Sequence, residues 1–291
     1  MTHRAAAFGC FILWMGCAGT AQAQSMLVGA VLPTAARVFD ISIPPQQVMR
    51  LGRMIWHNEC RGSYSGLTSW NQGEEFASLG IGHFIWYPEG GQGPFKESFP
   101  MLLAYLQRQG AVLPDWLKGA PPCPWPDRAA FRRDTYSPRM IELRLLLSRT
   151  VQLQARFIVA RLESALPRML ADLPEWEQAR VRFQFSRMAE QSAGIYALVD
   201  YVNFKGEGLK PQESYRGEAW GLRQVLQNMN GTEPGQPALD EFAASADDVL
   251  TRRVENSPPE RQETRWLPGW RLRINTYRLS FLGAANGPSR S

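Results

Sequence analysis

The sequence predicts an α+β fold, with a small antiparallel β lobe at about residues 60–90 and a larger, mostly α-helical lobe at about residues 97–282. Apolar residues recur at helical spacing before residue 60, and long helical patterns return after residue 97. Between them lie short runs rich in glycine, hydroxyl and aromatic residues, which are typical of short strands and turns. Helices packed against a small antiparallel sheet form an α+β domain, which we expect to span residues 44–282.

The first 23 residues have the features of a signal peptide. Arg4 supplies a positive charge, Ala5 to Met15 form an apolar core, and Ala21-Gln22-Ala23 is a small-residue cleavage site. No later stretch is long and uncharged enough to span a bilayer. Cys17 could carry a lipid anchor, but Trp14-Met15-Gly16 is a poor approach to a lipidated cysteine. We therefore expect a periplasmic or secreted protein with no transmembrane segment after cleavage.

The charge and the cysteines fit an exported protein. The formal net charge is +5, and the leader carries one of these charges, Arg4. Arginines are spread along the chain without a dense run, which favours anionic envelope polymers over nucleic acid as partners. Of the four cysteines, Cys10 and Cys17 lie in the leader. Cys60 and Cys123 remain, and we expect them to form one disulfide in an oxidising compartment.

The first helix and the sheet follow a lead-in over residues 24–43. Pro44-Pro45 opens a segment whose apolar residues have helical spacing, so we expect a helix over residues 45–59 with Glu59 at its C-terminal end. A small sheet is expected over residues 63–88, with a strand from Ser78 to Trp86. Glycines and prolines at 88–94 then predict a loop.

The remaining elements are expected to be helices joined by loops. They are Phe99 to Gln109, Arg139 to Leu166, Glu175 to Val202 with a break near Gly194, Gly217 to Met229, and Leu239 to Val254. Pro114 to Pro126, which contains Cys123, is expected to be a proline-rich connector, and Asn203 to Gly208 a loop. Residues 283–291 are small and polar, which predicts a flexible tail.

Glu59 is the candidate for chemistry. A carboxylic acid whose pKa is raised by apolar neighbours can protonate a glycosidic oxygen while a second carboxylate activates water. Ile55 and Trp56 supply such neighbours on the same helix. The alternative is an ordinary glutamate on a solvated helix end.

The segment from Trp56 to His83 resembles the phage-type lysozymes. In that family a catalytic glutamate closes the first helix, and a β-hairpin then carries an acidic residue, a hydroxyl residue and a Gly-Ile-Gly-His sequence. Glu59 matches the proton donor, Ser78 stands where threonine is usual, and Gly80-Ile81-Gly82-His83 matches the last motif, which we expect within a strand.

The second acid of the family is not matched. The position that commonly holds aspartate falls near Asn71 or Gln72, neither of which ionises, and the nearest carboxylates are Glu74 and Glu75. The resemblance implies a lysozyme-like fold and an exported muramidase that cleaves the bond between N-acetylmuramic acid (MurNAc) and N-acetylglucosamine (GlcNAc). Glu59 would donate the proton, and Ser78 with Glu74 or Glu75 would position water.

Two alternatives stay open beside a muramidase. A lytic transglycosylase needs only one catalytic acid, because the 6-hydroxyl of MurNAc replaces water. A non-catalytic envelope protein could keep the groove for binding glycan. In every case the partner is the peptidoglycan strand, and the sequence indicates no protein partner or oligomeric state.

Substrate-binding residues are expected on both sides of the cleft, because amphipathic aromatics stack on sugar rings and polar groups bind acetamido sugars or peptide stems. The candidates are His83, Trp70, Trp86, Tyr87, Tyr201, Asn203 and Lys205. Burial in the core is the alternative for the aromatic residues, and a hydrogen-bonded turn is the alternative for residues 201–207.

Two other kinds of catalysis are disfavoured. A cysteine hydrolase would need Cys60 with His57 or His83, and a sulfur held in a disulfide cannot act as the attacking thiolate. No metal or other cofactor is expected, because only two histidines follow the leader and no metal-ligand spacing is present.

Overall fold

The computed structural model describes residues 41, 43–93 and 95–279. The expected signal peptide, the lead-in up to residue 40 and the expected tail at 283–291 lie outside the described residues. Within the described ranges, no helix combines the length and the apolar character that a membrane crossing requires.

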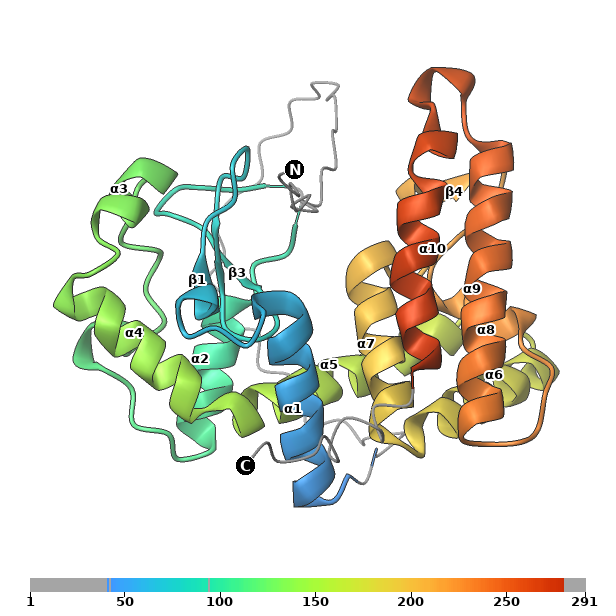
Figure 1. Ribbon diagram of the computed structural model, residues 1–291, viewed down its shortest axis with the longest axis horizontal. Coiled ribbons are helices and arrows are strands. Elements are labelled where there is room, and N and C mark those ends of the chain that lie inside the picture. Colours follow the sequence, from blue (N-terminus) through green and yellow to red (C-terminus); the bar gives the residue numbers. More distant parts are fainter. Residues whose placement is uncertain (1–40, 42, 94, 280–291) are drawn as a thin grey trace, which may run out of the picture.

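The protein is a mostly helical α+β structure with a small three-stranded antiparallel sheet and a larger helical region, as the sequence predicts. Figure 1 shows the sheet and helices α2 to α4 on one side, helices α6 to α10 on the other, and α1 and α5 between them. The first elements along the chain are α1 (Pro45–Cys60), β1 (Thr68–Ser69), β2 (Ala77–Leu79), β3 (Phe84–Trp86), α2 (Phe99–Arg108), α3 (Arg128–Arg133) and α4 (Pro138–Arg149). The other elements are α5 (Val151–Leu170), α6 (Glu175–Ala189), α7 (Ser192–Lys205), β4 (Ser214–Tyr215), β5 (Glu218–Ala219), α8 (Leu222–Asn228), α9 (Gln236–Asn256) and α10 (Leu267–Asn275).

The predicted strand from Ser78 to Trp86 is wrong in one respect, since it is two strands joined by a turn. β2 pairs with β1 on one side and with β3 on the other, and Ser78 lies opposite both Ser69 and Ile85. Residues 80–83 form the β2–β3 turn, in which Gly80 has φ +69° and His83 has φ +46°. Positive φ is incompatible with a strand, so the Gly-Ile-Gly-His sequence reverses the chain.

The predicted helix from Arg139 to Leu166 is also divided, into α4 and α5. The division falls at Thr150, whose backbone angles (φ −109°, ψ 17°) are not helical. Its hydroxyl donates to the carbonyl of Leu146 at 2.8 Å, and the Gln154 amide donates to the carbonyl of Leu147 at 2.6 Å. The Leu146 carbonyl also keeps its helical bond from the backbone N–H of Thr150 at 3.1 Å, and the Gln154 amide pairs the Leu147 carbonyl, so both carbonyls are satisfied at the bend.

The break expected near Gly194 lies between α6 and α7, at Glu190 and Gln191. A Cβ on Gly194 would come within 1.9 Å of the carbonyl oxygen of Met188. Glycine is therefore required because the backbones of α6 and α7 approach closely. α7 continues to Lys205, so the predicted loop from Asn203 begins too early.

The C-terminal part differs most from expectation. α9 matches the predicted helix, but α8 is shorter than predicted because the β4–β5 hairpin precedes it. α3 lies just beyond the predicted connector, and α10, near the end of the described chain, was not predicted. α10 packs along α9.

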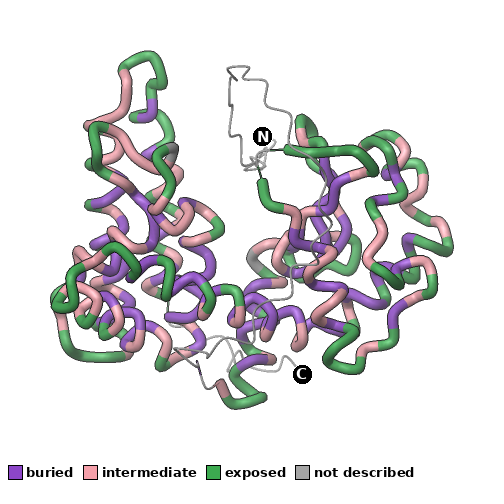
Figure 2. The backbone as a smooth tube through the Cα atoms, turned by 180° about the vertical axis from the view of Figure 1, so that it is seen from behind, coloured by how far each residue is buried: buried purple, intermediate pink, exposed green. Residues whose placement is uncertain are grey.

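The buried residues line the interior of both sides of the molecule and follow α5 across it (Figure 2). α1 contributes Val48, Leu51 and Ile55 to this core, all at most 3% exposed. α1 packs mainly on α5 and α7. The end of α1 is thereby fixed relative to both the sheet and the helices.

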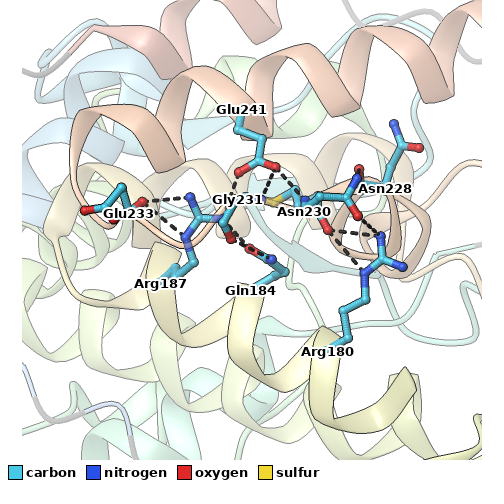
Figure 3. A network of polar contacts seen from close by, with 9 residues as sticks. Arg180, Gln184, Arg187, Asn228, Asn230, Gly231, Glu233 and Glu241 are labelled. Carbon is cyan, nitrogen blue, oxygen red and sulfur yellow. Dashed lines mark hydrogen bonds and ion pairs between the residues drawn. The ribbon is translucent and has the colours of Figure 1, made fainter. Parts of the chain in front are cut away.

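A buried polar network joins α6 and α9 to the loop after α8 (Figure 3). Arg187, which is 2% exposed, donates to Gln184, to a Glu241 carboxylate oxygen at 2.8 Å and to the carbonyl of Glu233. Glu241 also accepts from the backbone N–H of Gly231 at 2.7 Å. Arg187 and Glu241 are paired with each other and with backbone groups of the loop, so the network fixes this loop.

Candidate active site

Glu59 is the next-to-last residue of α1, as predicted. The helix ends because Arg61 and Gly62 adopt positive φ angles of 54° and 64°, and the N–H of Gly62 donates back to the carbonyl of Trp56 at 3.1 Å. This left-handed termination is common at helix C-termini and turns the chain toward the sheet. Glu59 therefore lies where α1 meets the β2–β3 turn.

The two carboxylate oxygens of Glu59 each face a nitrogen of a basic side chain. His83 Nδ1 lies 3.5 Å from Oε2, and Arg273 Nη2 lies 3.5 Å from Oε1. His83 comes from the β2–β3 turn and Arg273 from α10, so elements far apart in sequence converge on one carboxyl group. The Glu59 side chain remains 25% exposed, which leaves it accessible to a ligand.

Burial raises the pKa of Glu59 above its usual value, and the charge of Asp200 adds to the rise, although His83 and Arg273 act against it. Loss of solvent destabilises the carboxylate more than His83 and Arg273 stabilise it. A glutamic acid that keeps its proton at higher pH is suited to donate that proton to a leaving group.

Asp200 holds Arg273 in place from α7. Arg273 Nε and Nη2 donate to its two oxygens at 2.8 and 2.6 Å, and the hydroxyl of Tyr277 also donates to it. The Asp200 side chain is only 2% exposed. Both carboxylate oxygens of Asp200 are hydrogen-bonded to protein, so Asp200 is not available to a substrate. Its role is to position Arg273.

The β2–β3 turn is fixed to α5 by Gln154. The N–H of Ile81 donates to Gln154 Oε1 at 3.0 Å, and a Cβ on Gly80 would lie 2.4 Å from that oxygen. Gly80 is needed both for its positive φ and for this close approach. Gln154 therefore determines where the turn presents His83 to Glu59.

Cys60, the last residue of α1, also contacts His83. Its sulfur lies 3.8 Å from His83 Nε2 and 3.7 Å from the carbonyl oxygen of Gly80. With Glu59 on the other ring nitrogen, this has the order of a Cys-His-Glu triad. However, Cys60 is only 5% exposed, and burial, with the nearby charge of Glu59, raises its pKa to about 12. A buried, protonated thiol is a poor nucleophile.

The expected disulfide is not formed in the structure, where Cys60 and Cys123 are both free and buried. Cys60 lies beside His83 at the start of β3, whereas the N–H of Cys123 donates to the carbonyl of Tyr87 just after its end, at 2.9 Å. Four residues of extended chain cover about 13 Å. The two cysteines therefore contact opposite ends of β3.

Comparison of the chain with protein-family models, curated proteins and solved structures found no match. The functional interpretation of this site therefore depends on its geometry.

The expected partners of Glu59 in catalysis do not gather around it. Glu74 and Glu75 lie in the β1–β2 loop, at the end of β2 away from the turn that carries His83. Glu74 accepts from the Asn71 amide at 3.0 Å, and Glu75 is exposed. Ser78 is buried within β2, and no hydrogen bond between described residues joins it to Glu59.

Most of the aromatic residues expected to bind sugar are core residues. Trp70, Trp86 and Tyr87 are 6%, 0% and 5% exposed, and their polar atoms donate to the carbonyls of Glu74, Pro121 and Phe95. Tyr201 is fully buried and donates to the carbonyl of Trp220. Lys205 is buried, with its ammonium 3.3 Å from the centre of the Trp270 ring. These side chains have no free face for a sugar.

Asn203 and the β2–β3 turn do share a pocket. It has a volume of about 80 Å³ and lies between the turn, α5 and α7. The turn contributes Gly82, next to His83, and α7 contributes Val199 and Asn203 on either side of Asp200. The pocket is therefore built in part from the turn that carries His83 and the helix that carries Asp200.

Proposed function

We propose that this protein is an exported peptidoglycan glycosidase that cleaves the bond between MurNAc and GlcNAc with Glu59 as the general acid, within a lysozyme-like fold. The observation that carries the proposal is a partly exposed glutamic acid with a raised pKa, placed between His83 and Arg273 where the two sides of the molecule meet. Proton donation to a glycosidic oxygen requires such a group.

The surroundings of Glu59 favour a mechanism with one catalytic acid. Among the described residues, Asp200 is the carboxylate whose charge acts on Glu59, and it is buried and bonded to Arg273 and Tyr277. Neither Glu74 nor Glu75 influences the pKa of Glu59. We therefore place the lytic transglycosylase reaction ahead of the hydrolytic one.

In this reaction Glu59 gives its proton to the oxygen that leaves with GlcNAc, as the bond from that oxygen to C1 of MurNAc breaks. The 6-hydroxyl of the same MurNAc then attacks C1, and the Glu59 carboxylate accepts the hydroxyl proton. The product is a 1,6-anhydro ring, and Glu59 returns to its acid form. His83 and Arg273 stabilise the carboxylate between the two proton transfers.

The test is mass spectrometry of fragments released from purified peptidoglycan by the mature protein. Glu59→Gln keeps the shape of the side chain and removes the acid, and Glu75→Gln is the matched control in the exposed β1–β2 loop. We expect 1,6-anhydro ends with the parent and with Glu75→Gln, and none with Glu59→Gln. If the released fragments have reducing MurNAc ends instead, the reaction is hydrolysis and the protein is a muramidase. Folded parent protein that releases nothing would contradict glycosidase activity and favour a glycan-binding role.

A further inference from the structure

The pocket between the β2–β3 turn, α5 and α7 carries an excess of positive charge. Its charged lining residues are Arg161 and Arg168 on α5 and Glu207 after α7. Arg168 donates through Nε and Nη2 to both carboxylate oxygens of Glu207, at 3.1 and 2.5 Å. The charges of Arg168 and Glu207 offset each other in this ion pair. The charge of Arg161 therefore gives the pocket lining a net charge of about +1.

Arg161 has no carboxylate within ion-pairing distance among the described residues. Its guanidinium carbon lies 6.0 Å from the centre of the Phe157 ring on the preceding turn of α5. Arg161 is accessible to solvent, yet burial and the charge of Arg168 lower its pKa, although the charge of Glu207 acts against this. A cation that is partly desolvated and unpaired has much to gain from an incoming anion.

The rest of the lining fits a carboxylate on an apolar scaffold. Gly82, Phe84, Ile158 and Val202 supply apolar surface, and Asn203 adds an exposed amide that can donate a hydrogen bond. The volume of about 80 Å³ suits a small group better than a sugar ring.

We propose that this pocket is a carboxylate-binding subsite in which Arg161 binds the acidic group that the glycan carries on MurNAc. The inference rests on the proposed function, because the lactyl group and its peptide stem are attached at C3 of the MurNAc ring whose C1 reacts near Glu59. The carboxylate belongs to the stem peptide in intact strands, and to the lactyl group in strands without stems. Arg161 then selects MurNAc-containing polymer over uncharged chitin-like strands.

The experiment measures the dissociation constants of three soluble oligosaccharides of equal length in the Glu59→Gln background, which prevents turnover. One carries stem peptides, one carries free lactyl carboxylates after removal of the stems, and one is a chito-oligosaccharide without carboxylates. The variants are Arg161→Gln, Glu207→Gln and, as matched control, Arg156→Gln, which lies on the same helix outside the pocket. Among the described residues, the Arg161 side chain has no hydrogen bond to protein and lies only 6.0 Å from the Phe157 ring, so its substitution is expected to disturb folding little.

We expect Arg161→Gln to raise the dissociation constants of the carboxylate-bearing ligands about tenfold, as loss of a charge-assisted hydrogen bond does. The dissociation constant of the chito-oligosaccharide should not change. Glu207→Gln removes the ion-pair partner of Arg168 and is expected to lower the dissociation constants of the same ligands. Arg156→Gln should leave all three dissociation constants unchanged. If Arg161→Gln loses affinity only for stem-bearing strands, Arg161 binds the stem carboxylate. If it loses affinity only for strands without stems, Arg161 binds the lactyl carboxylate. Either result supports the subsite.

Equal effects of Arg161→Gln on all three ligands, or no effect on any, would overturn the subsite while the parent still binds and cleaves glycan. Failure of the parent to bind any of the three would instead overturn the proposed function and the subsite together. The two failures are therefore distinguishable.

Discussion

Arg273 donates to both carboxylate oxygens of Asp200, at 2.8 and 2.6 Å, while its Nη2 also lies 3.5 Å from Oε1 of Glu59. The guanidinium on α10 thus joins a buried carboxylate on α7 to the accessible one at the end of α1. Because Asp200 offsets much of the charge of Arg273, Glu59 experiences a weaker positive field than its closest cation alone would produce. This arrangement is compatible with a raised pKa for Glu59.

Asp200→Asn removes the charge that raises the pKa of Glu59, so we expect the pKa of Glu59 to fall. The alkaline limb of the activity profile should move to lower pH, and the unpaired Arg273 should cost about 3 kcal/mol of stability. Asp247→Asn is the control, since it breaks an exposed pair with Arg271 on the same helix α10. That surface pair should contribute under about 1 kcal/mol. An unchanged pH profile in Asp200→Asn would contradict the electrostatic role of Asp200.

Glu59 itself should make stability depend on pH. Its pKa is raised in the folded state, so its contribution to stability is present below the unfolded pKa and is lost as pH rises through the folded pKa. Glu59→Gln, which does not titrate, is therefore expected to gain stability relative to the parent as pH rises from 4 to 8. Thermal melts of both proteins across this range measure it, and a constant difference in Tm would contradict a raised pKa.

The sequence predicted half of this site because its signals are local. Helical spacing before residue 60 and the glycine-rich run after it predicted Glu59 at a helix end beside a small sheet, and the structure has both. The Gly-Ile-Gly-His motif identified His83 as a candidate residue, but it did not predict that residues 80–83 form a turn. The positive φ of His83 depends on contacts across the fold. β-branched and aromatic residues on both sides favoured one continuous strand.

The other half depends on contacts that span the chain. Arg273 lies 214 residues after Glu59, in a short helix that begins with Leu267-Pro268-Gly269-Trp270 and has no clear apolar period. Asp200 sits in an α7 that is buried on most sides, so polarity alone did not distinguish it. Aspartate buried within the apolar residues 195–202 was the one available signal, since buried charges need partners.

Gln154 should control the geometry of the β2–β3 turn. Gln154→Leu leaves the N–H of Ile81 and the carbonyl of Leu147 unpaired in the interior, which we expect to cost about 3 kcal/mol. Activity should also fall, because His83 is no longer held beside Glu59. Gln152→Leu, on the same helix and partly exposed, is the control for both denaturant unfolding and activity. A variant with full activity would show that the turn holds its position without Gln154.

Cys60 should be dispensable for the reaction. Burial keeps its thiol protonated, with a pKa of about 12, so Cys60→Ser should retain activity within a factor of about two. Cys123→Ser is the matched control at the other buried thiol. A loss of several orders of magnitude confined to Cys60→Ser would instead assign a cysteine hydrolase with His83 as base. Thiol titration of the unfolded, unreduced parent tests the disulfide in the same experiment, since the free thiols of the structure predict two reactive groups per mature chain.

Glu241 should stabilise the helical side without affecting catalysis, because its network joins α6 and α9 to the loop after α8 (Figure 3) and, among the described residues, shares no hydrogen bond with Glu59. Burial alone would raise the pKa of Glu241, but hydrogen bonds from the N–H groups of Asn230 and Gly231 and from Arg187 outweigh it and lower the pKa. The stabilisation is therefore present above the unfolded pKa and is lost as pH falls through the folded pKa.

At pH 7 we expect Glu241→Gln to lose about 2 to 4 kcal/mol, since Arg187 is left buried without its counter-charge. The difference from the parent should shrink as the pH falls below 4, where the parent also loses the charge. Glu218→Gln, which breaks an exposed contact with Arg252 at 3.9 Å, should change little at either pH. Activity per folded molecule should match the parent, and a specific loss of activity would mean that α6 and α9 transmit their packing to Arg273 through α10.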